Sequence, residues 1–100
     1  MTREDAQAKL EEYRVLIDGL DRRIVALLNE RTQVVEEIGR VKRESGLPIY
    51  EPKREELVFA NITGANQGPM PSDSLRRIFE RVIDEMRRIQ RLRMEAAGEK

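Results

Sequence analysis

The sequence predicts an all-α protein of three helices, one long, one short and one of medium length, in a single domain over residues 1–100. Apolar residues recur in steps of three and four along most of the chain, as on one face of a helix, and no segment shows strand-like alternation. Charged residues make up 38% and apolar residues 39%, without Trp. This composition favours thin apolar seams between helices over one thick core.

The first helix is expected over residues 5–44. At 1.5 Å per residue it would be about 60 Å long, which exceeds the width of a 100-residue globule. Its own chain cannot bury it, so we expect a second copy and an intertwined helical homodimer. Flanking apolar residues widen the stripe beyond a two-stranded coiled coil. The stripe consists of Leu10, Tyr13, Ile17, Leu20, Ile24, Leu27, Val34, Ile38 and Val41, flanked by Leu16, Val25, Leu28 and Val35.

Glycine and proline divide the rest of the chain into two shorter helices. Gly46 and Pro48 end the first helix, because glycine suits a helix C-terminus and the residue before proline avoids helical angles. A helix over about 52–65 and another over about 73–94 follow, separated by a loop rich in glycine and proline. The tail over 95–100 is expected to fray.

Composition excludes several classes of function. Lys plus Arg and Asp plus Glu both number 19 and are interleaved along the chain, so no nucleic-acid or membrane-surface partner is expected. Cys and His are absent, which removes thiolate nucleophiles, the usual general base and the commonest metal ligands. We therefore expect no cofactor and no metal. No apolar run has the length of a membrane span and no signal peptide is evident, so a cytoplasmic protein is expected.

Arg31 interrupts the apolar stripe of the first helix, four residues after Leu27. Burying an unpaired charge costs several kcal/mol, so this guanidinium must be solvated, paired with a carboxylate, or facing an anionic ligand. Lys42 lies about three turns further on the same face, roughly 16 Å away. Val35 and Ile38 lie between them, so a small elongated anion could bind there. An ordinary lysine near a helix end is the alternative for Lys42.

Three further polar features stand out. Arg14 is about 25 Å from Arg31 along the helix, so only an antiparallel second copy could bring it to the same site. Arg54 belongs to a charged cluster at a helix start, where a cation is unfavourable. Gln90 follows Met86 by four residues beside the apolar stripe, and a buried amide needs partners. Surface positions remain the alternative for each.

Together these residues resemble the all-α (AroQ-type) chorismate mutase family over nearly the whole chain. The segment LDRRIVALLNER at 20–31 resembles the family's first-helix signature, whose closing arginine is Arg31. VEEIGRVK at 35–42 supplies Lys42 at the expected distance, and IYEPKRE at 49–55 matches the pattern of an acidic residue before an Arg-Glu pair. Gln90 falls where the family carries a catalytic Gln or Glu.

The resemblance implies roles for these residues in converting chorismate to prephenate. Arg31 and the second copy's Arg14 would bind the substrate carboxylates, while Lys42 and Gln90 would hydrogen-bond the ether oxygen of the breaking bond. The other expected substrate contacts are Glu55 to a hydroxyl, a polar wall of Glu51 and Arg54, and Val35, Ile38 and Met86.

One departure from the family and one closer likeness are visible. Met86 stands where some members have a serine that contacts a carboxylate, so that contact is expected to be missing. The segments 29–31, 34–39 and 68–71 look most like mutase domains fused ahead of a DAHP synthase. A fused or associated DAHP synthase and a free-standing relative of such domains both remain open. The alternatives are a regulatory domain that senses chorismate or prephenate without turnover, and an isochorismate-pyruvate lyase on the same scaffold.

Overall fold

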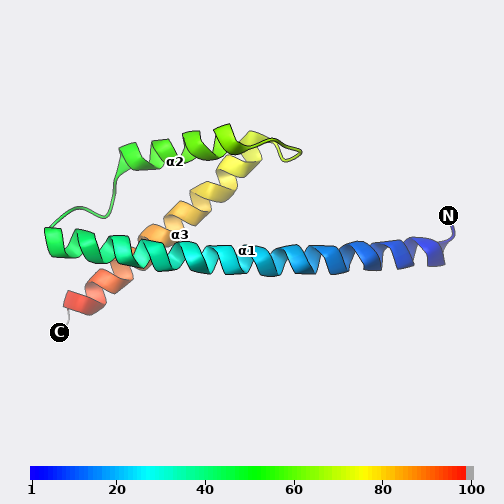
Figure 1. Ribbon diagram of the computed structural model, residues 1–100, viewed down its shortest axis with the longest axis horizontal. Helices are drawn as coiled ribbons and strands as arrows, with labels where there is room; N and C mark the ends of the chain where they lie inside the picture. The colour runs from blue at the N-terminus through cyan, green and yellow to red at the C-terminus, as the bar shows by residue number, and fades with distance from the viewer. Residues whose placement is uncertain (99–100) are drawn as a thin grey trace. The chain divides into compact units, whose positions relative to one another are not determined.

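The computed structural model describes residues 1–98 and contains three helices over that range (Figure 1). They are α1 (Arg3–Ser45), α2 (Pro52–Ala65) and α3 (Ser72–Gly98). The predicted all-α class of one long, one short and one medium helix is confirmed, with no strand among the described residues. None of these helices is long and apolar enough to cross a membrane.

The third helix is longer than the sequence suggested. We expected it to end near residue 94 and to fray from 95, but α3 continues to Gly98. Met94, Glu95, Ala96 and Ala97 all favour the helical state, so the last turn needs no packing partner to persist. The remainder of the expected tail, residues 99–100, lies outside the described residues.

The described chain forms two compact parts, divided between Gln33 and Val34 within α1. The first part is a single helix whose start is capped reciprocally: the Asp5 backbone N–H donates to the Thr2 hydroxyl at 3.0 Å, and the Thr2 backbone N–H donates to the Asp5 carboxylate at 3.3 Å. Its apolar stripe is exposed. The large apolar residues of this part that are exposed are Leu10, Tyr13, Val15, Leu16, Ile17, Leu20, Ile24, Val25, Leu27 and Leu28.

The second part contains the end of α1 together with α2 and α3. Its buried apolar side chains, among the described residues, are Val35, Ile83 and Met86. Two polar side chains, Lys42 and Gln90, are buried to the same degree, with about 8% of each residue exposed. Because a buried polar group without a hydrogen bond is destabilising, the stability of a core with so few apolar side chains depends on the partners of Lys42 and Gln90.

The turn after α1 is formed by a glycine with left-handed backbone angles. Gly46 has a φ of 66°, its N–H donates to the Arg43 carbonyl, and the Leu47 N–H donates to the Lys42 carbonyl at 2.8 Å. This pair of hydrogen bonds is a Schellman motif, which satisfies the last carbonyls of a helix. Pro52 then occupies the first turn of α2. Residues 47–51 therefore return past the end of α1, beside Lys42.

Candidate functional site

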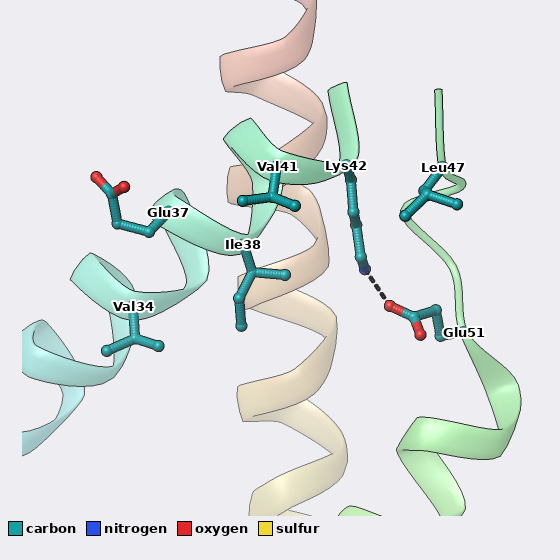
Figure 2. A pocket seen from close by; sticks show the side chains of 7 residues that line it. All are labelled: Val34, Glu37, Ile38, Val41, Lys42, Leu47 and Glu51. Atoms are coloured by element: carbon teal, nitrogen blue, oxygen red, sulfur yellow. Dashed lines mark ion pairs between the residues drawn. The ribbon is translucent and has the colours of Figure 1, made fainter. Parts of the chain in front are cut away.

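Lys42 is the central charged group of the second part. Its ammonium forms an ion pair with the Glu51 carboxylate at 2.7 Å (Figure 2). It also donates to the Ile49 carbonyl at 2.8 Å. The Lys42 side chain is 10% exposed, whereas that of Glu51 is 49% exposed. An ammonium has three N–H donors, and these two partners satisfy two of them. One donor is therefore left over with respect to the described residues.

Both partners of Lys42 are placed by the same short connection. Ile49 lies in the segment that follows the Gly46 turn, and Glu51 is the N-cap residue of α2. The Glu51 carbonyl accepts from the Glu55 N–H at 3.0 Å, which begins the helical hydrogen-bond pattern. Because the backbone of Glu51 is held by α2, its carboxylate can meet Lys42 without ordering a long free segment.

Lys42 and Glu51 line a pocket of about 370 Å³ at the end of α1 (Figure 2). Ile38, which the sequence suggested as a substrate contact, also lines it. The remaining walls are mainly apolar, with one further carboxylate; they are Val34, Glu37, Val41 and Leu47. A mostly apolar wall beside a buried N–H donor is suited to a small ligand that carries apolar surface and a hydrogen-bond acceptor, and an anionic ligand here would need cations beyond Lys42, because the wall also contains two carboxylates.

Gln90 is buried where α3 meets α1. Its side-chain N–H donates to the Val35 backbone carbonyl at 3.2 Å. Since a carbonyl can only accept, this contact determines which end of the amide faces α1, and it leaves the second N–H for another acceptor. Gly39 leaves room for this approach: a Cβ at that position would be in ordinary van der Waals contact, 3.4 Å from the Gln90 Cγ, and a larger side chain would not fit without a shift.

Two expected substrate contacts belong to the buried core, and their contact with the substrate stays a prediction. Val35 and Met86 are both buried, and neither is among the residues that line the pocket described above. Val35 is three residues before Ile38, so the two side chains are about 60° apart around the helix. Ile38 faces the pocket, whereas Val35 lies at the contact with Gln90.

Glu55 has a partner that the sequence analysis did not identify. Its carboxylate lies 3.2 Å from the Arg87 guanidinium, which also donates to Asp84 at 2.8 Å and lies over the Tyr50 ring at 4.9 Å from the centroid. Asp84 is three residues before Arg87 and could have signalled a helical ion pair. The contact with α2 has no sequence signal, because it depends on how the two helices pack.

The other expected cations are Arg54, Arg31 and Arg14. Arg54 is exposed in the first turn of α2. Arg31 is half-buried and Arg14 is exposed, with its guanidinium 4.0 Å from Glu11. Arg14 and Arg31 belong to the first part of the chain, residues 1–33. Their convergence with Lys42 and Gln90 therefore stays a prediction.

Comparison with known proteins identifies the family. The family profile described as chorismate mutase type II matches residues 13–91, which contain Lys42, Glu51, Glu55 and Gln90. The chain belongs to this family. The resemblance noted in the sequence is thus confirmed at the level of the all-α chorismate mutases.

Solved structures of chorismate mutases have the same fold. Chorismate mutase (form II) from Thermus thermophilus superposes with a TM-score of 0.81 at 37% identity, covering 83% of this chain and 94% of that one. Among curated relatives, a chorismate mutase from Methanocaldococcus jannaschii is 35% identical over 54 residues, which is 54% of each protein.

Longer relatives carry the chorismate mutase region beside another enzyme. The bifunctional chorismate mutase/prephenate dehydratase of Aquifex aeolicus is 37% identical over 79 residues, 75% of this chain. This chain spans only about a fifth of that relative, 22% of its length. The second enzyme in the relative is prephenate dehydratase and not the DAHP synthase that the sequence suggested.

The Gly39–Gln90 contact generates a prediction about stability. We expect Gly39→Val to lower the free energy of unfolding by about 1–3 kcal/mol, because the added methyl groups must displace Gln90 from the Val35 carbonyl. Gly39→Ala is the matched control. Its Cβ makes an ordinary contact, and alanine favours a helix by about 0.5–1 kcal/mol over glycine.

Urea unfolding measures both stabilities, and the side-chain amide signals of Gln90 in a proton–nitrogen NMR spectrum report its hydrogen bond. Equal stability of the two variants, with unchanged Gln90 signals, would show that a large side chain at position 39 does not displace Gln90, and this would contradict the prediction.

Proposed function

We propose that this chain catalyses the rearrangement of chorismate to prephenate. The observation that supports this most directly is the buried Lys42 ammonium, paired with Glu51 and the Ile49 carbonyl, at a largely apolar pocket in a member of the chorismate mutase family. The reaction is unimolecular and needs neither a nucleophile nor a proton transfer. Positioning and electrostatics can therefore provide the catalysis.

In the proposed mechanism, Lys42 and Gln90 stabilise the charge that develops during bond cleavage. Negative charge grows on the ether oxygen as the C–O bond breaks. The N–H of Lys42 that neither Glu51 nor Ile49 uses, and the N–H of Gln90 that Val35 does not use, would donate to this oxygen. Donors that are already fixed favour the transition state over the ground state, since they need not reorganise during the reaction.

Arginines would select the reactive conformer of the substrate. We assign Arg31 and the Arg14 of a second copy to the two carboxylates, with Arg54 completing the polar wall and Glu55 accepting from the substrate hydroxyl. Glu51 would contribute mainly by holding Lys42, its 2.7 Å partner. Clamping both carboxylates restricts the substrate to a compact shape, and such effects can contribute several kcal/mol.

The assembly we propose is a homodimer in which Arg14 acts in the other subunit's site. The exposed apolar stripe of residues 3–33 supports it, since so many adjacent apolar side chains are unfavourable in water. A second copy offers the same stripe and would cover it through a two-fold interface. The expected cytoplasmic location stays a prediction.

Association with a DAHP synthase is a finer proposal. It is supported by the sequence of residues 29–31, 34–39 and 68–71, whereas the bifunctional relatives named above carry prephenate dehydratase. Titration calorimetry of the chain with a DAHP synthase tests it, and an absence of binding heat would contradict it.

The substrate assignment predicts that Arg31→Ala and Lys42→Ala each lower kcat/KM for chorismate by at least ~100-fold, since loss of a buried ionic contact is worth roughly 3 kcal/mol. Arg43→Ala, which removes an exposed cation next to Lys42, is the control and should retain activity. The assay is the loss of chorismate absorbance, with circular dichroism to verify the helices.

Near-normal turnover by either of the first two variants would refute the assigned role of that residue. Binding of chorismate or prephenate without turnover would instead support a regulatory domain, and pyruvate release from isochorismate would support a lyase.

The shared site predicts complementation between inactive variants. Arg14→Ala and Lys42→Ala should each be inactive alone, but a dimer with one copy of each would contain one site with both native residues. Refolding the two chains together in equal amounts should restore about one quarter of wild-type activity, because half of the dimers are mixed and each has one intact site. A mixture that stays inactive, although mass spectrometry detects mixed dimers, would contradict the contribution of Arg14 in trans.

The neutral amide of Gln90 predicts a pH profile. Between about pH 5 and 8 it does not change charge, so the rate should not fall as the pH rises through this range. In Gln90→Glu the introduced carboxyl can donate only when protonated, so activity should decrease with rising pH. Stopped-flow or steady-state rates at each pH measure this. A wild-type rate that collapses above about pH 5 would exclude the role proposed for Gln90.

A further inference from the structure

We propose that Arg87 is a positioning residue that holds Glu55 and the Tyr50–Glu51 connection in place for the reaction. This inference rests on the proposed function, in which Glu55 accepts a hydrogen bond from the substrate hydroxyl. It is carried by a three-sided contact of one guanidinium with Glu55, Asp84 and Tyr50.

The Arg87–Glu55 pair joins α3 to α2 and is largely shielded from solvent. Both side chains are only 25% exposed. Other arginines of the same helix make pairs of a different kind: Arg81 and Arg88 contact Glu85 within one helical turn, and their side chains are 76% and 62% exposed. Exposed pairs within one turn add little to stability or order. The Arg87–Glu55 pair, which is shielded and joins two helices, is therefore the one suited to fix the position of the Glu55 carboxylate relative to α3.

Arg87 makes two edge contacts and one face contact with its guanidinium. One nitrogen lies 3.2 Å from a Glu55 oxygen and another donates to Asp84 at 2.8 Å, while the flat face covers the Tyr50 ring. A planar guanidinium can make edge and face contacts at once, which an ammonium cannot. Because Asp84 lies on the same helix as Arg87, it holds the arginine side chain in the direction of α2.

The contact with Glu55 engages only one of its two carboxylate oxygens. Arg87 is paired with the Oε2 atom, so the Oε1 atom remains able to accept a hydrogen bond from a hydroxyl group. Tyr50, beneath the guanidinium, lies between Ile49 and Glu51, the two partners of Lys42. Arg87 therefore contacts both the helix that carries Glu55 and the connection that holds Lys42.

Arg87 also offsets the negative charge of Glu55, which would otherwise repel the substrate. The proposed substrate carries two negative charges, and both Glu51 and Glu55 would repel it. Each has its own cation at close range: Lys42 for Glu51 and Arg87 for Glu55. Asp84 shares Arg87 with Glu55, so these two cations and three carboxylates leave one negative charge, and attraction of the substrate depends on the cations outside them.

The test is a double-mutant cycle of Arg87→Met with Glu55→Gln, measured as kcat/KM for chorismate. If Arg87 acts through Glu55, Arg87→Met lowers the rate about tenfold and adds little once Glu55→Gln is present. Arg87→Lys, which keeps the charge but not the planar contacts, should recover part of the loss. Arg88→Met, at the adjacent exposed arginine, should leave the rate unchanged.

The outcomes separate the two proposals. A wild-type chain without turnover overturns the proposed function and this inference with it. An active wild type whose two losses multiply fully overturns the inference alone, because Arg87 and Glu55 would then act independently. If Arg87→Met loses its helical circular dichroism, the same cycle with Arg87→Lys decides between a coupled and an independent effect.

Discussion

The need to pair a buried ammonium determines much of the local structure around Lys42. A charged group this shielded is destabilising unless hydrogen bonds replace its water, and Lys42 has two close partners, the Glu51 carboxylate and the Ile49 carbonyl. Both come from the connection after α1. That connection must therefore turn sharply at Gly46 and must start α2 at Pro52, immediately after Glu51. Lys42 therefore depends on three consecutive pieces of structure: the end of α1, the turn at Gly46 and the start of α2.

The helices could be predicted from the sequence because apolar spacing and the Gly and Pro positions are local signals. Other features depend on packing, and the sequence does not resolve them. Val35 and Ile38 lie near one another on one side of α1, but Val35 is buried and Ile38 lines the pocket, a difference that depends on which residues pack against each. Arg87 was missed because its partners lie on another helix and in a loop.

The two parts of the chain differ in how much of their apolar surface they bury and in whether they contain buried polar groups with partners. Residues 34–98 contain their own buried side chains and pair their buried polar groups, whereas residues 1–33 form a helix with an exposed apolar stripe. Helical periodicity predicts where that stripe lies but not what covers it. A helix with apolar residues on one face normally acquires its stability by packing that face. This is the physical basis for our proposal that a second copy completes the domain.

The proposed chemistry accounts for a neutral donor beside a paired cation. A carboxyl group at position 90 could donate only while protonated, and an ionised one would repel an oxygen that is gaining negative charge. The Gln90 amide donates in either case, and its contact with the Val35 carbonyl already determines its orientation. That contact in turn needs the close approach that Gly39 permits. The glycine at position 39 thus leaves room for the buried amide on α3, and a hydrogen-bond donor is held ready without any group having to change its protonation state.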